Sequence, residues 1–339
     1  SNFPQDWMVR ARWIQRKLVK CYQQWGISEP ELGTLSALTL GYRENLDDDI
    51  QRSFQRAGAT HILAVSGLHT GIIYAVLLFI LTIGGTCIPL YEEKTKRIVL
   101  SLIIIATMWG YALITGMSPS VVRAVIMVSL LQVAYMCYRQ PNAINTIAAA
   151  AFLILCFKPL DLFSVSFQLS FAAVIAIVLL EPALQRLFPN IEKPKVLKSG
   201  YTWVRGLISV SLAAQIGTLP LTLYYFGQTT YYFVLTNLVV IPIATLILWL
   251  AFLTFAFEWI PIVGTILTFV LQWLTRAMNI YVKWVEQLPG CVQQHSISLP
   301  MVWVYIVAVF CAYWAFKRSF WWFIGVGAAL TIYCLLYCC

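Results

Sequence analysis

The sequence predicts an all-α, polytopic helical membrane protein with about eight to ten membrane helices, some of them broken, and amphipathic helices at its N-terminal end. Two observations predict this fold class. Hydrophobic residues make up 60% of the chain and charged residues only 11%, and the mean hydropathy of +0.78 lies far above that of a soluble globular protein. Apolar runs long enough to cross a bilayer also recur along the chain.

A helix needs roughly 17 to 25 apolar residues to cross a bilayer. Runs of this kind cover residues 62–84, 98–115, 119–137, 142–157, 162–181, 203–226, 231–257, 260–284, 299–316 and 320–337. Two of these runs have a second interpretation. Residues 260–284 carry Arg276 and Lys283, so they also fit an amphipathic helix lying in the membrane interface. Residues 142–157 are few, and their alanines suit a helix packed inside the bundle.

Residues 1–60 differ from the rest, because basic side chains alternate there with aromatic and aliphatic ones, as in the stretch from Arg10 to Lys20 around Trp13. This mixture at helical spacing predicts amphipathic, interfacial helices that lead into a membrane domain over residues 61–339. Anchoring to the membrane surface is the plainer role for these helices. Gathering an anionic ligand is the alternative.

The distribution of lysine and arginine predicts the orientation, because short cytoplasmic loops are enriched in both. One side of the predicted bundle holds Lys94, Lys96, Arg97, Arg139, Arg186, Lys193, Lys195, Lys198, Lys317 and Arg318. The short loops opposite hold little beyond Lys158. We therefore expect the first side to be cytoplasmic and the N-terminal segment to be external. The C-terminus is external if all ten runs cross, and cytoplasmic if residues 260–284 lie in the interface.

Residues 61–71 place His69 among small polar residues inside an apolar run. Polar groups lack water in hydrocarbon, so these side chains should face protein or a wet cavity. A broken helix at Gly67 that opens onto a conduit is one interpretation, and close helix packing through Gly67-x-x-x-Gly71 is another. A nucleophile and base formed by Ser66 and His69 is the third. No residue nearby would orient the histidine, and the Gly-x-Ser-x-Gly elbow is absent.

A second informative stretch runs from Thr115 to Ala124. Ser118 followed by Pro119 has the form of an N-cap with proline at the first helical position, so one helix should end near Gly116 and another begin at Pro119. Arg123 then lies one turn inside the second helix. It can extend to the interface, or it can face the bundle beside the free amides of the helix start and bind phosphate there.

Polar residues recur beside the predicted breaks at Gly67, Pro119, Pro220 and Pro242. Each one alone could join helices by a hydrogen bond. Together they predict an internal hydrophilic path. Its candidate residues are Ser66, Gly67, His69, Thr115, Ser118, Arg123, Gln168, Ser170, Gln215 and Asn237.

Several kinds of chemistry lack their usual residues. The sequence contains no Gly-x-x-x-x-Gly-Lys phosphate loop and no His-Glu-x-x-His pair, so it predicts neither ATP hydrolysis nor a catalytic metal. Nine cysteines occur without a Cys-x-x-Cys pair, which does not resemble a disulfide framework. We expect no cofactor.

Ordered motifs over residues 30–250 resemble the ComEC/Rec2 family of competence proteins. The motifs are Ala37-Leu-Thr-Leu-Gly-Tyr-Arg43, Phe54-Gln-Arg-Ala-Gly58, His61-Ile-Leu-Ala-Val-Ser-Gly-Leu-His69, Thr115-Gly-Met-Ser-Pro-Ser-Val-Val-Arg123, Phe167-Gln-Leu-Ser-Phe171 and Ala213-Ala-Gln-Ile-Gly-Thr-Leu-Pro220. Asn145, Pro159, Asn237 and Pro242 extend the likeness. The chain after residue 260 matches only in hydropathy.

The resemblance implies a channel, and not an enzyme, that passes one strand of DNA across the bacterial inner membrane during natural transformation. It implies single-stranded DNA and the lipid bilayer as partners, with a DNA receptor on the outer face and a DNA-translocating ATPase or helicase in the cytoplasm. Relatives often add an oligonucleotide-binding domain and a nuclease-like domain, so this chain resembles the isolated membrane domain. The polar path would then be the DNA pathway. A transporter of a small anion or metabolite remains the alternative, because it would use the same broken helices.

Overall fold

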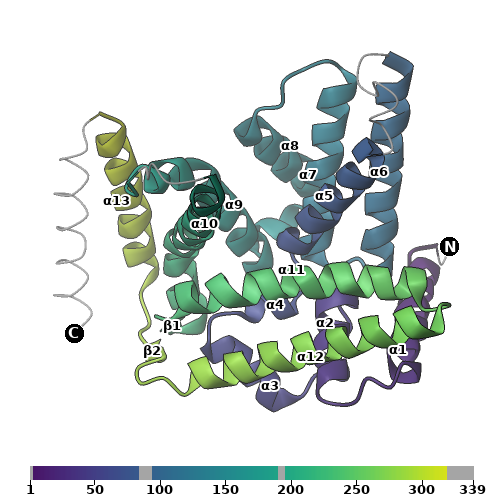
Figure 1. The fold of residues 1–339 in the computed structure, drawn as a ribbon. Coiled ribbons are helices and arrows are strands. Elements are labelled where there is room, and N and C mark those ends of the chain that lie inside the picture. Colours follow the sequence, from purple (N-terminus) through teal and green to yellow (C-terminus); the bar gives the residue numbers. More distant parts are fainter. Residues whose placement is uncertain (1–2, 84–93, 190–194, 319–339) are drawn as a thin grey trace. The chain divides into compact units, whose positions relative to one another are not determined.

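A computed structural model of the chain describes residues 3–83, 94–189 and 195–318, and most of them are helical (Figure 1). The chain divides into two compact units. Unit 1 comprises Ser1–Leu162 and Val239–Pro289, and unit 2 comprises Phe163–Leu238 and Gly290–Cys339. Each unit is described by itself.

Unit 1 is built from helices of both the N-terminal segment and the apolar region. These are α1 (Phe3–Gln24), α2 (Glu31–Leu40), α3 (Asp48–Arg56), α4 (Thr60–Leu63), α5 (Gly67–Ile83), α6 (Lys94–Ile114), α7 (Pro119–Met136), α8 (Ala143–Phe157), most of α11 (Phe233–Phe257) and α12 (Pro261–Glu286). The short helix η1 (Pro159–Phe163) follows α8. Unit 2 contains α9 (Val165–Gln185), α10 (Lys195–Phe226), β1 (Gln228–Thr230), the start of α11, β2 (Val292–Gln294) and α13 (Leu299–Arg318).

The structure confirms an all-α membrane protein. Within the described part of the chain, six helices are long and apolar enough to cross a membrane: α6, α7, α9, α10, α11 and α12. Three shorter apolar helices, α5, α8 and α13, match other predicted runs. The run at 320–337 lies outside the described residues. Helix α12 covers the stretch whose interfacial placement the sequence left open, and its length and composition alone also suit a span.

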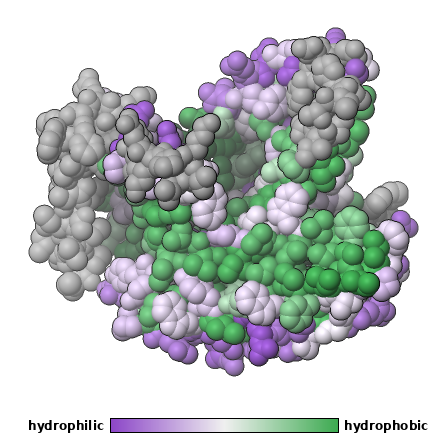
Figure 2. All heavy atoms as spheres, in the orientation of Figure 1, coloured by the Kyte–Doolittle hydropathy of each residue, from purple (hydrophilic) through white to green (hydrophobic). Residues whose placement is uncertain are grey.

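The N-terminal helices pack closely with the rest of unit 1. All ten residues of α2 are buried, and α2 contacts α1, α4 and α12. Helix α12 turns one face to α2 and α3 and leaves an apolar face exposed, which carries Ile262, Ile266, Phe269, Trp273, Ile280 and Trp284. Figure 2 shows hydrophobic residues gathered over α11 and α12, bordered by the hydrophilic edge that contains α3.

Two of the four predicted helix breaks are confirmed. The chain bends between α4 and α5, so that α5 begins at Gly67, and α7 begins at Pro119. The breaks predicted at Pro220 and Pro242 are wrong, because these prolines lie inside the continuous helices α10 and α11. Proline at 220 leaves the carbonyl of Ile216 without its helical donor. The Tyr305 hydroxyl of α13 donates to that carbonyl at 3.2 Å, which replaces the lost bond.

Unit 2 is held together by the close approach of α9 and α10. A Cβ atom added at Gly217 would lie 2.3 Å from Ala176 Cβ and 2.8 Å from the carbonyl oxygen of Ala172. Only glycine lets the two backbones come this near. The antiparallel pair β1 and β2, with Thr229 opposite Gln293, joins the end of α10 to the segment before α13.

Candidate functional site: a junction of helix ends in unit 1

Three turns of the chain meet in unit 1, and we call this place the helix-end junction. Its parts are the C-terminal end of α2, the α4–α5 link and the α6–α7 link. A Cβ atom added at Gly41, which follows α2, would lie 3.2 Å from both the Thr115 carbonyl oxygen and Val65 Cγ2. Because Gly41 has no side chain, the three turns can touch.

Glycine in a left-handed conformation ends both α2 and α6. Gly41 has φ +71°, and Tyr42 N donates to the Ser36 carbonyl at 3.1 Å. Gly116 has φ +72°, and Met117 N donates to the Ala112 carbonyl at 2.8 Å. The bonds after Gly116 form the Schellman motif that closes a helix C-terminus, whereas at Gly41 the amide of Gly41 donates to the Ala37 carbonyl at 3.1 Å, as in the αL motif. The predicted helix end near Gly116 is thus confirmed.

Gln15 of α1 connects two of these turns. Its Nε2 donates to the Leu40 carbonyl at 2.8 Å, and its side chain is buried. A Cβ atom added at Gly116 would lie 2.9 Å from the same Nε2. The end of α2 and the α6–α7 link are therefore both fitted around one amide, which the sequence alone did not single out.

His69 is fully buried at the start of α5. Its Nδ1 accepts a hydrogen bond from the Ser66 backbone N–H at 3.2 Å and lies 3.1 Å from Ser66 Oγ. Because a backbone N–H can only donate, Nδ1 is the unprotonated ring nitrogen and the ring proton is assigned to Nε2. Within the described part of the chain, that buried Nε2 has no hydrogen-bond partner. The bond from Ser66 thus fixes the imidazole ring, and the Nε2–H donor lies on the side of the ring opposite to that bond.

The first turns of α5 and α7 pack side by side. A Cβ atom added at Gly67 would lie 3.9 Å from Ala124 Cβ. The neighbouring Arg123 is only 6% exposed, so it does not extend from the surface into water. Asp161 of η1 interacts with it electrostatically. A buried guanidinium in an apolar helix is costly, and such residues commonly mark functional positions.

Other polar groups near these helix starts also lack partners among the residues described. Ser118 occupies the predicted N-cap position of α7, but its side chain caps no backbone amide, and its buried Oγ has no partner. Tyr111, one turn before Thr115, has a buried hydroxyl with none. Thr115 itself is satisfied, because its Oγ1 donates to the Tyr111 carbonyl at 3.0 Å.

The remaining predicted residues lie in unit 2 and form separate contacts there. Gln168 Oε1 accepts from the Tyr225 hydroxyl at 2.7 Å, and Gln215 Nε2 donates to Thr229 Oγ1 at 3.4 Å. Asn237 Nδ2 donates to Ser211 Oγ at 3.4 Å, and both residues are buried. Ser170 is half-buried on α9.

The predicted residues thus fall into two sets. One set lies at the α4–α5 and α6–α7 links of unit 1 and in the first turns of the helices that follow them: Ser66, Gly67, His69, Thr115, Ser118 and Arg123. The other four residues belong to unit 2. A continuous path through both sets stays a prediction.

Sequence reasoning missed several polar residues of the same kind. Gln132 of α7 is fully buried and donates to the Tyr74 hydroxyl of α5 at 2.8 Å. It is a lone amide in an apolar helix, so the criterion that selected Gln168 would have found it. Tyr225, the partner of Gln168, gave no signal, because tyrosine is common where membrane helices meet water.

Comparisons with known proteins give the family. A family model described as Competence protein matches residues 38–324. ComE operon protein 3 of Bacillus subtilis is 31% identical over 213 residues, which make up 63% of this chain and 25% of that protein. Competence protein ComA of Neisseria gonorrhoeae is 27% identical over 147 residues, 43% of this chain and 21% of that protein. An uncharacterised protein of Aquifex aeolicus is 29% identical over 179 residues, 53% of this chain and 37% of that protein.

No solved structure matches the chain. The chain spans between 21% and 37% of the length of these curated relatives. The family model covers most of the chain, including both the helix-end junction and the polar contacts of unit 2. The chain is therefore a multi-pass membrane protein that belongs to the competence protein family.

Proposed function

We propose that this chain takes part in DNA uptake during competence, and that it forms a channel for a single DNA strand in the bacterial inner membrane. Family membership and the names of two relatives support the broad role. We infer from the lysine and arginine pattern of the loops that the N-terminal segment lies on the external side of that membrane. The partners of this channel would be a DNA receptor on the outer face and a DNA-translocating ATPase or helicase in the cytoplasm.

The observation that carries the proposal is the buried polar character of the helix-end junction. Arg123 and the Nε2–H of His69 are buried in apolar helices, and burying each of these polar groups costs free energy. Apolar side chains would pack at the same positions without this cost. A guanidinium and free N–H donors near helix N-termini suit phosphate groups passing one after another. A passive conduit of this kind carries out no bond-breaking reaction, so we propose that the chain is not an enzyme.

The test replaces Arg123 in the full-length protein and measures entry of labelled DNA into the cytoplasm of cells that depend on this protein. We expect Arg123→Ala to reduce entry at least about ten-fold, because a charged hydrogen bond to phosphate contributes about 1.5–3 kcal/mol. Arg123→Lys should restore part of the loss. Arg139→Ala, at an exposed position beyond the end of α7, is the matched control. Unchanged entry in Arg123→Ala at equal protein level would refute the proposal.

One contact favours a second candidate, an intramembrane serine hydrolase. Ser66 Oγ lies 3.1 Å from His69 Nδ1, within reach for proton transfer. That nitrogen also accepts the Ser66 backbone N–H, and among the described residues no carboxylate holds Nε2. A fluorophosphonate probe that labels the purified protein, but not its Ser66→Ala variant, would favour the hydrolase. We expect no such labelling, because no carboxylate among the described residues orients the ring.

A further inference from the structure

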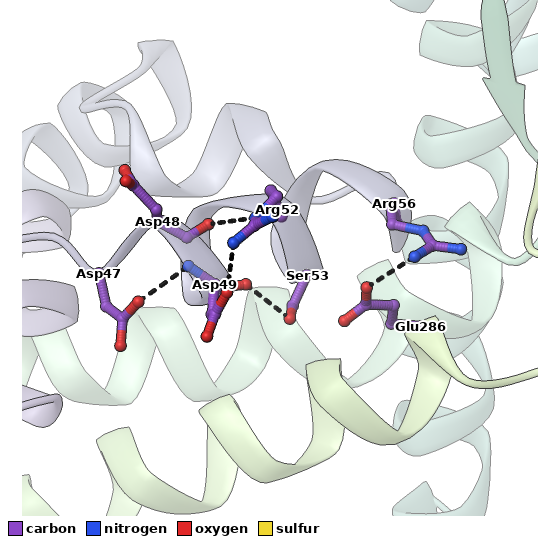
Figure 3. Close-up of polar contacts among 7 residues, drawn as sticks. All are labelled: Asp47, Asp48, Asp49, Arg52, Ser53, Arg56 and Glu286. Atoms are coloured by element: carbon purple, nitrogen blue, oxygen red, sulfur yellow. Dashed lines mark hydrogen bonds and ion pairs between the residues drawn. The ribbon is translucent and has the colours of Figure 1, made fainter.

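A groove in unit 1 lies between α3 and the C-terminal end of α12, away from the helix-end junction. It is open on one side and has a volume of about 310 Å³, near the lower end of the volumes of small-ligand sites. Its lining residues are Asp49, Arg52, Ser53, Arg56, Lys283, Glu286 and Gln287. Cations and carboxylates thus face the same small space, and Figure 3 shows most of them.

The sequence of α3 fixes one wall of the groove. Asp47 is the N-cap, and its carboxylate accepts from Asp49 N at 2.8 Å. Arg52 donates to the Asp49 carboxylate one turn earlier, and Ser53 Oγ donates to the Asp49 carbonyl at 2.8 Å. Asp49 is thus held at the first turn, where negative charge is favourable.

The other wall comes from α12. The Arg56 guanidinium donates to Glu286 Oε1 at 3.2 Å, which joins the two helices across the groove. Lys283 has no hydrogen bond or ion pair within the part of the chain described. Three cations and two carboxylates line the groove, and the Lys283 ammonium is the charge without an internal counterpart. A ligand that fits must offer a negative group to Lys283 and can offer a positive group to the carboxylates.

An apolar surface continues directly from the rim. Ile280, Lys283, Trp284 and Gln287 lie three and four residues apart, so they share one side of α12. Ile280 and Trp284 are exposed, and Trp273 and Phe269 extend the same strip along the helix. A tryptophan beside a lysine at the end of an apolar helix is typical of the level of the lipid headgroups.

We propose that this groove binds the headgroup of a phospholipid that carries both a phosphate and a primary amine, as phosphatidylethanolamine does. Lys283 and Arg56 bind the phosphate, Asp49 and Glu286 accept hydrogen bonds from the ammonium, and the acyl chains lie along Ile280 and Trp273. The carboxylates and the small volume argue against a DNA strand here, because they repel a polyanion and leave room for one headgroup. The bound lipid would hold α3 to the end of α12 at the membrane surface.

The test is native mass spectrometry of the full chain, purified in detergent and titrated with dioleoyl phosphatidylethanolamine or dioleoyl phosphatidylcholine. We expect tighter retention of the ethanolamine lipid, because a choline group has no N–H to donate. Lys283→Gln should weaken binding of both lipids at least about ten-fold. Asp49→Asn should reduce the preference for ethanolamine, because only the Glu286 carboxylate then remains for the ammonium, and should leave the phosphatidylcholine affinity within about two-fold.

Lys20→Gln, at an exposed position of α1 outside the groove, is the matched control and should bind like the original chain. Lys283 is exposed, so its replacement should not disturb folding, and circular dichroism and elution volume verify this. Equal binding of both lipids, or binding unchanged in Lys283→Gln, would overturn the proposal. So would displacement of the lipid by inorganic phosphate as readily as by glycerophosphoethanolamine. Displacement by a single-stranded oligonucleotide that Lys283→Gln abolishes would assign the groove to DNA instead.

Discussion

Gly116 and Gln15 show how single residues shape the helix-end junction. Gly116 needs both a left-handed backbone and an empty space, because the Gln15 amide occupies the place of a side chain. That amide is in turn held by the Leu40 carbonyl. A change at Gly116 therefore reaches α1 and α2 as well as the link between α6 and α7.

Gly116→Ala should destabilise the protein more than Gly26→Ala. Both glycines follow a helix in a Schellman motif with positive φ, but nothing lies within 4 Å of a Cβ atom at Gly26. We expect Gly26→Ala to cost about 1–2 kcal/mol for backbone strain alone. Gly116→Ala should cost about 1 kcal/mol more, because the Gln15 amide must leave Leu40. Thermal unfolding in detergent measures both, and equal costs would show that Gln15 moves aside freely.

Residues of this kind differ in how far the sequence reveals them. His69 and Arg123 could be found because polar side chains stand out in apolar helices, and both are indeed buried. Gln15 could not be found. It lies in an amphipathic helix rich in polar residues, where one more glutamine is ordinary, and its importance comes only from a contact with Leu40, 25 residues away.

At the level of whole helices, α10 shows why some predicted helix breaks were confirmed and others were wrong. Local rules locate helix starts well, so Gly67 and Pro119 begin α5 and α7. The same rules fail at Pro220, because a hydroxyl from α13 supplies the donor that proline lacks. A contact between residues 216 and 305 cannot be seen in a local window of sequence.

Tyr305→Phe should destabilise unit 2 by about 1 kcal/mol, in the range of hydrogen bonds between membrane helices. Tyr313→Phe on the same helix is the control, because no contact of its hydroxyl is present among the described residues. Pro220→Ala restores a backbone donor to Ile216, so Tyr305→Phe should cost much less in that background. Unfolding in detergent of the four variants of this double-mutant cycle measures the coupling. A Tyr305→Phe cost that is the same with proline and alanine at 220 would contradict this account.

At the scale of the whole molecule, the sequence predicts the fold class and most of the helices but not how the helices group into units. Hydropathy was enough for the class and for nine of the predicted apolar runs, which the structure shows as helices α5 to α13. Hydropathy could not divide the chain into units. In unit 1, α12 packs on α2, although more than two hundred residues separate the two helices. Such a contact depends on complementary buried faces, which hydropathy does not describe.

Orientation in the membrane is the property of the whole molecule that the lysine and arginine pattern predicts. Cys137 lies in the link between α7 and α8, two residues before Arg139, on the side expected to be cytoplasmic. Cys156 lies near the C-terminal end of α8, two residues before Lys158, and therefore on the opposite side. Both cysteines are exposed and free. In intact cells, each kept as the only cysteine, we expect a membrane-impermeant maleimide to label Cys156 and to leave Cys137 unlabelled until the cells are opened. Labelling in the reverse order would invert the whole orientation and place the N-terminal helices, with the groove beside α3, in the cytoplasm.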